Sequence, residues 1–227
     1  MPAYFEMSLQ FQRKDLYSSF ITDFDAHLER SGLVFGDGFW EDEGLSQGEI
    51  AAWNQKKLEA DFVLGMTTHR SHDYKQTLYD FGGYGEIRGF WMNQYPDGGQ
   101  FNYSIIIPES EVVDGDNYTI FLPGRAAQLR ELAEKLWQFP AVKAIQTGME
   151  EDDHTKLRML RKGVPACARP FAILERDCHP YDDGSQVIEL TQGRPGLLLL
   201  DSDDLMGPLI ELPGGLGLVR LKEQDDR

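Results

Sequence analysis

The sequence of 227 residues contains only two cysteines, Cys167 and Cys178. Small secreted proteins depend on several disulfides, so two cysteines do not indicate a disulfide-stapled scaffold. The N-terminus, MPAYFEMSLQFQ, has no basic region followed by an apolar run, and no stretch approaches the ~20 apolar residues that a membrane helix needs. We therefore expect a cytoplasmic protein with two reduced thiols and no membrane insertion.

Lysine and arginine are scarce relative to acidic residues. The chain has 22 basic and 38 acidic residues, a net charge of -16, and residues 31–55, 89–124 and 195–219 contain no Lys or Arg. Nucleic acids and anionic membranes bind mainly to clustered Lys and Arg, so this distribution argues against both as partners. A basic protein partner would instead be attracted and steered. The alternative is that the acidity serves solubility alone.

Recognisable nucleotide-binding and calcium-binding motifs are missing. The glycine clusters at 82–85 and 214–217 have neither the G-x-G-x-x-G spacing nor a Gly-Lys-Ser/Thr ending, and they fit tight hairpin turns. Residues 201–204 begin like a calcium loop, but Met206 and Leu212 stand where that loop needs Gly and Glu. The sequence therefore predicts no cofactor.

Two histidines stand three positions apart in TTHRSHDY, residues 67–74. On a helix His69 and His72 would share one face, and Asp73 could supply a third ligand. Because no other His, Cys or carboxylate cluster has ligand spacing, we predict a polar connection without a metal. His69-Arg-Ser also matches half the signature of two-histidine phosphoesterases, but no second His-x-Ser/Thr occurs. The competing hypothesis is a metal-assisted hydrolase centred on these three residues.

Hydrophobic periodicity predicts an α+β fold. Residues 4–11 alternate apolar and polar side chains, as in a strand with one buried face, and residues 77–107 contain three strand-like runs separated by glycine-rich turns. Apolar residues at helical spacing predict helices at 15–31, 46–62 and 125–138. Because the strands show one apolar face each, we expect a mostly antiparallel sheet with the helices packed on one face.

The character of the chain changes after residue 150. The sequence EEDDH is a polar break, and the region that follows is rich in short strand-like runs and tight turns. We therefore expect an α+β main domain at 1–150 and a β-rich C-terminal extension or small subdomain at 151–227.

Aromatic and acidic side chains occur together in FGDGFWEDE, residues 35–43. An aromatic anchor with a charged rim is typical of protein interfaces, and residues 109–116 add further acids. The predicted partner-binding residues are Asp37, Phe39, Trp40, Glu41, Asp42, Glu43, Glu109, Glu111, Asp114 and Asp116. The alternative is a core tryptophan with a solvated acidic turn beside it.

In composition, the chain resembles the immunity proteins that neutralise toxins in bacterial competition, which are small, acidic, α+β and free of catalytic motifs. The resemblance rests on composition and not on particular residues. It implies a non-enzymatic cytosolic protein that binds a basic partner, such as a nuclease-like toxin whose active site attracts phosphate. The hydrolase hypothesis and a role as a structural or assembly subunit compete with this reading.

Overall fold

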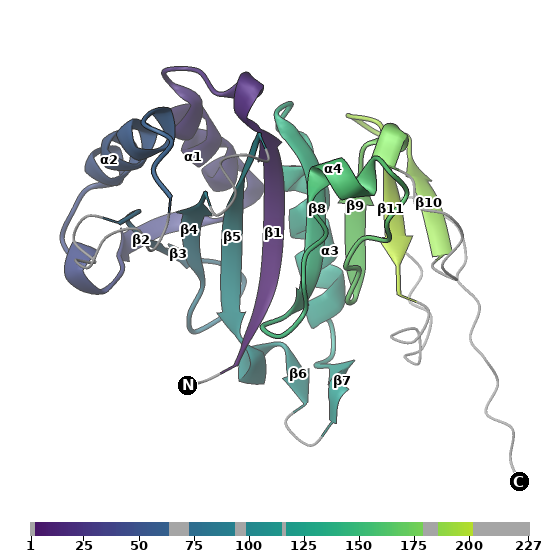
Figure 1. The fold of residues 1–227 in the computed structure, drawn as a ribbon. Helices are drawn as coiled ribbons and strands as arrows, with labels where there is room; N and C mark the ends of the chain where they lie inside the picture. Colours follow the sequence, from purple (N-terminus) through teal and green to yellow (C-terminus); the bar gives the residue numbers. More distant parts are fainter. Residues whose placement is uncertain (1–2, 64–72, 94–98, 115–116, 179–185, 202–227) are drawn as a thin grey trace, which may run out of the picture.

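A nine-stranded sheet forms the body of the protein in the computed structural model, which describes residues 3–63, 73–93, 99–114, 117–178 and 186–201 (Figure 1). The strands are β1 (Tyr4–Gln12), β2 (Val34–Gly38), β3 (Thr77–Asp80), β4 (Arg88–Met92), β5 (Gln100–Pro108), β6 (Val113–Asp114), β7 (Asn117–Phe121), β8 (Val142–Met149), β9 (Phe171–Leu174), β10 (Gln186–Leu190) and β11 (Gly196–Leu200). The helices are α1 (Phe20–Ser31), α2 (Gln47–Glu59), α3 (Arg125–Leu136) and α4 (Leu157–Leu160).

The strand order in the sheet is β10-β11-β9-β8-β1-β5-β4-β3-β2, and each neighbouring pair is antiparallel. β6 and β7 form a separate two-stranded ribbon. The predicted α+β class with a mostly antiparallel sheet is confirmed. Among the described helices, none is long and apolar enough to cross a membrane.

The first face of the sheet carries the main core. The apolar residues of β1, from Phe5 to Phe11, point to this face, and α1 and α3 cover it from behind in Figure 1. The Phe11 ring meets the rings of Phe20 and Phe24 of α1 edge to face, each with ring centroids 5.4 Å apart. Edge-to-face aromatic pairs add to the free energy gained by burial, so these contacts fix α1 against the central strand.

The helix ends follow the predicted signals with one correction. Ser46 and Glu49 form a capping box at the start of α2, and Gly32 ends α1 with a left-handed φ of 108°. The prediction that the first helix begins at Asp15 is wrong. Residues Arg13–Asp15 form a separate 3-10 turn, and α1 begins only at Phe20.

The second face of the central strand is buried as well, although the alternation in residues 4–11 predicted one buried face only. Ser8 and Gln10 are each 1% exposed. Residues 152–157 cross this face, and the carbonyl of Thr155 accepts hydrogen bonds from Gln10 Nε2 (3.0 Å) and Gln146 Nε2 (2.7 Å). Local periodicity could not predict this cover, because it comes from a segment over 140 residues away.

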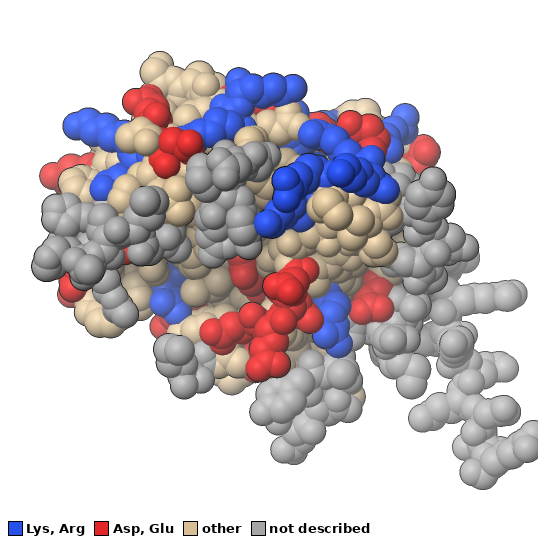
Figure 2. All heavy atoms as spheres, viewed as in Figure 1, with Lys and Arg blue, Asp and Glu red and all other residues tan. Residues whose placement is uncertain are grey.

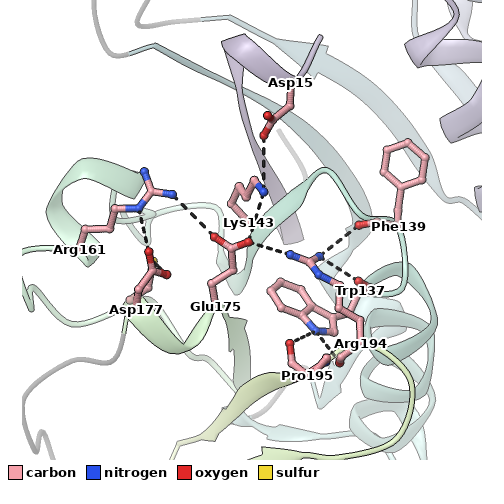
Figure 3. A network of polar contacts seen from close by, with 10 residues as sticks. Asp15, Trp137, Phe139, Lys143, Arg161, Glu175, Asp177, Arg194 and Pro195 are labelled. Carbon is pink, nitrogen blue, oxygen red and sulfur yellow. Dashed lines mark hydrogen bonds and ion pairs between the residues drawn. The ribbon is translucent and has the colours of Figure 1, made fainter. Parts of the chain in front are cut away.

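The strands that follow residue 150 extend the same sheet, and a polar network fastens them to the end of α3 (Figure 3). Arg194 donates to the carbonyls of Trp137 (3.1 Å) and Phe139 (3.2 Å), and its guanidinium lies 4.0 Å from the centroid of the Trp137 ring. Glu175 accepts from Arg194 Nη2 (2.9 Å) and from Lys143 Nζ (3.3 Å). The hairpin of β10 and β11 is thereby held against the main core.

Candidate functional site

The loop after β2 is shaped by one carboxylate and one glycine. Asp37 Oδ1 accepts from the backbone N–H groups of Gly38 (2.7 Å) and Gly44 (2.9 Å), which closes the loop around the side chain. A Cβ atom added at Gly38 would lie 2.0 Å from the carbonyl oxygen of Asp42. Only glycine allows this close return of the backbone. Asp37, predicted to contact a partner, therefore holds the loop together.

Trp40 is the outermost aromatic residue of this loop. Its side chain is 62% exposed, so it lies at the surface and not in the core. Its φ of 59° is left-handed, a conformation that costs a bulky residue about 1–3 kcal/mol. The strain persists because the surrounding loop fixes the backbone on both sides of the residue. The loop thus places a large aromatic side chain at the surface.

Phe39 packs inward from Trp40 and contacts a largely buried arginine, Arg88. The guanidinium carbon of Arg88 lies 4.4 Å from the centroid of the Phe39 ring and 4.6 Å from that of the Tyr4 ring. Arg88 Nε is 2.9 Å from Glu86 Oε1. Such cation–π contacts are stronger when the cation is desolvated, so Arg88 supports the base of the loop. The sequence gives no signal for this role, since it depends on strand pairing.

The acids of the loop differ in what they do. Glu41 and Glu43 are exposed. Asp42 is only 15% exposed on its side chain and forms an ion pair with Lys75, whose ammonium also lies 5.0 Å from the Trp53 ring. Glu41 and Glu43 are therefore the loop carboxylates that can contribute a field to an approaching partner.

The second acidic segment lies close to the first. Glu111 accepts from the backbone N–H groups of Gly85 (2.5 Å) and Glu86 (3.2 Å), and Glu86 pairs with Arg88 beneath the first loop. Glu111 is thus half-buried and structural. Three predicted residues are placed as follows: Glu109 is half-buried, Asp114 is exposed, and Asp116 lies outside the described residues.

The predicted histidine pair cannot be placed, because His69 and His72 lie outside the described residues. The backbone carbonyl of Asp73 accepts a hydrogen bond from Trp53 Nε1 (2.8 Å). Within the described part of the chain, no group of three His, Cys, Asp or Glu residues could hold a metal ion.

The two thiols lie in environments that oppose ionisation. Burial raises the pKa of Cys167 to about 11, and Asp152 adds to this increase. Burial also raises the pKa of Cys178 to about 12, with Asp177 acting in the same direction. A nucleophilic cysteine needs a lowered pKa, so these thiols are poorly suited to that chemistry.

An acidic run that the predicted site did not include lies on the second face of the sheet. Residues 150–153 are four consecutive acids, of which only Asp152 is half-buried. Figure 2 shows acidic side chains gathered near the lower ends of β1 and β8, and basic side chains along the upper part of this view around α4. Acidic side chains are therefore concentrated in the lower part of this view and basic side chains around α4, and each region also contains some side chains of the opposite sign.

Comparison with known proteins adds no relative. No family model matches the sequence, and no curated protein or solved structure matches it either.

Proposed function

We propose that this protein binds a basic protein partner through a surface made of Trp40, Glu41 and Glu43, here called the Trp40 surface. The observation that carries the proposal is the exposed Trp40 side chain, held in a left-handed backbone conformation beside two exposed carboxylates. A left-handed backbone conformation at a bulky residue lowers the stability of the folded protein. Residues strained in this way occur mainly at functional sites.

The charge of the whole chain supports the same proposal. A protein with a net charge of -16 accelerates the approach of a basic partner, and a well-packed aromatic residue then slows dissociation. Asp42 and Asp37 contribute through the loop geometry, because their carboxylates already have partners within the chain. The partner we favour is a nuclease-like toxin, whose phosphate-binding site would be basic.

Affinity capture with matched variants tests this function. The bait proteins are the wild type, Trp40→Ala, the pair Glu41→Lys with Glu43→Lys, and the control pair Glu29→Lys with Glu131→Lys. The control pair makes the same change in net charge on exposed positions of α1 and α3, behind the sheet in Figure 1. We expect one basic protein to be retained by the wild type and the control and lost from both Trp40-surface variants. Equal capture by all four baits would overturn the proposal.

A further inference from the structure

The second face of the sheet contains a cluster of buried polar side chains at its centre. Ser8 of β1 pairs with Ser104 of β5 on one side and with Gln146 of β8 on the other, and all three are at most 1% exposed. Ser8 Oγ, Gln10 Oε1 and His154 Nε2 are buried and have no hydrogen-bond partner among the described residues. A buried polar atom without a partner costs about 1–3 kcal/mol, so several in one cluster call for an explanation.

Glu6 places a negative charge at the edge of this cluster. Its Oε1 accepts a hydrogen bond from Ser104 Oγ (2.6 Å) and lies 3.8 Å from His154 Nδ1. A carboxylate has about four acceptor positions, so most of the hydrogen-bonding capacity of Glu6 remains available. The Glu6 side chain is 25% exposed, so this residue lies where the cluster meets solvent.

The unused groups near Glu6 are mainly acceptors. The amide nitrogens of Gln10 and Gln146 both donate to the carbonyl of Thr155, which leaves Gln10 Oε1 unpaired. A hydroxyl such as that of Ser8 can accept, and so can one ring nitrogen of a neutral histidine. A ligand that forms hydrogen bonds with these unpaired acceptors must carry hydrogen-bond donors.

The electrostatic environment favours a positive charge on that ligand. Burial lowers the pKa of His154, which keeps the ring neutral, although Glu6, Asp152 and Asp153 act in the opposite direction. Asp152 forms an ion pair with Arg169 (3.1 Å), whereas the ion pair of Glu6 within the described part of the chain is with the His154 ring, and that pair is charged only when the ring is protonated. An uncompensated, half-buried carboxylate attracts a cation.

We propose that Glu6, Ser8 and His154 form a binding site for a small organic cation, an alkylammonium or alkylguanidinium head group. Glu6 takes the charge through a charge-assisted hydrogen bond, and Ser8 Oγ and His154 Nε2 accept from the remaining N–H groups. The head group can belong to a free molecule or to a lysine or arginine side chain. The site is separate from the Trp40 surface, and the proposal does not depend on the function argued above.

Titration of three small probes tests the site. Methylguanidinium, ethylammonium and the neutral analogue methylurea are added to the full-length protein while the ring resonances of His154 are followed by NMR. We expect the two cations to bind with a Kd of about 1 mM, in the range of a single small contact, and methylurea to bind at least about tenfold more weakly. Equal binding of methylurea, or no movement of the His154 resonances, would overturn the proposal.

Matched variants assign the binding to Glu6. Glu6→Gln keeps an acceptor for Ser104 Oγ but removes the charge, and we expect it to weaken cation binding at least about tenfold. Glu151→Gln removes one exposed charge from the nearby acidic run and should change the Kd less than about twofold. If Glu6→Gln does not fold, Ser8→Ala takes its place, because it removes a hydroxyl that has no partner. Unchanged binding in the folded Glu6→Gln or Ser8→Ala protein would contradict the assignment.

The source of the head group is decided by a fourth probe, the capped tripeptide Gly-Arg-Gly. Binding of this peptide as tightly as methylguanidinium indicates that the site accepts an arginine side chain of a protein. Binding of the free cations without the peptide indicates a small molecule. Failure of all of these cationic probes would exclude the site.

Discussion

Among the carboxyl groups of the described residues, Asp25 of α1 is the one whose ionisation is most affected by the fold. Burial raises its pKa to about 7. Because this value lies above that of the unfolded chain, the folded state binds the proton more tightly. The contribution of Asp25 to the free energy of unfolding is therefore fully present below about pH 4, where its carboxyl group is protonated in both states. It is lost as the pH rises towards 7, because the unfolded chain releases the proton first.

Asp25→Asn should raise the free energy of unfolding at pH 8 by up to about 4 kcal/mol, because the buried charge is removed, and by clearly less at pH 5. Urea unfolding at the two pH values measures the difference. Glu29→Gln, an exposed change on the same helix, is the control and should have no pH-dependent effect. The same stabilisation by Asp25→Asn at both pH values would show that ionisation of Asp25 is not responsible.

The two thiols should react slowly in the folded protein. Their raised pKa values reduce the thiolate fraction at neutral pH at least about a hundredfold relative to a free cysteine, and the thiolate is the reactive form. Modification by iodoacetamide at pH 7.5, followed by intact-protein mass spectrometry, should be slow in buffer and fast in urea. Rapid labelling of Cys167 or Cys178 without denaturant would argue that the thiol is more accessible or more acidic than the structure indicates.

Two arginine–carboxylate pairs near strands β10 and β11 differ in burial. They should therefore contribute differently to the free energy of unfolding. Arg194 and Glu175 have side chains 19% and 23% exposed, whereas Arg176 and Glu189 are 57% and 64% exposed. Arg194→Ala should lower the free energy of unfolding by about 2–4 kcal/mol, since it also removes two hydrogen bonds and the stacking on Trp137.

Arg176→Ala is the matched control for this prediction and should cost less than about 1 kcal/mol, because exposed ion pairs contribute little. Denaturant unfolding monitored by the intrinsic tryptophan fluorescence of the protein reports on both changes. Equal losses in the two variants would mean that the network around Glu175 does not fasten the β10–β11 hairpin.

Local signals allowed most elements to be predicted from the sequence. The capping box at Ser46 and Glu49 and the left-handed Gly32 are determined by neighbouring residues, and both were predicted. The polar cluster around Glu6 and His154 was not, because it forms only when residues 152–157 cross a strand that lies far away in the sequence. The alternation of apolar and polar residues at 4–11 correctly predicted which side chains of β1 point to the main core. It could not predict which segment covers the polar face of the strand.

Whether an acidic residue acts within the fold or faces solvent is decided by the folded structure of the whole molecule. Composition predicted a strongly acidic protein, but it could not distinguish carboxylates that act within the fold from those that face solvent. Asp37 and Glu111 bind backbone N–H groups, and Asp42 pairs with Lys75, so each is used internally. Glu41 and Glu43 remain exposed. The acidic field at the Trp40 surface therefore comes from fewer residues than the sequence suggested.

The binding kinetics of the captured partner test the central claim most directly. Stopped-flow association is measured at rising NaCl concentration for the wild type, for Glu41→Lys with Glu43→Lys, and for the control pair Glu29→Lys with Glu131→Lys. For Trp40→Ala, the rate of dissociation from the partner is measured. Because the Debye length falls from about 10 Å at 0.1 M salt to about 3 Å at 1 M, a steered association slows steeply as salt is added.

We predict that Glu41→Lys with Glu43→Lys slows association at low salt about tenfold more than the control pair does, and that Trp40→Ala raises the dissociation rate more than about tenfold. The contrary result is association of the Glu41→Lys with Glu43→Lys protein at the wild-type rate in low salt, with an unchanged dissociation rate for Trp40→Ala. That result would show that the Trp40 surface does not bind the partner.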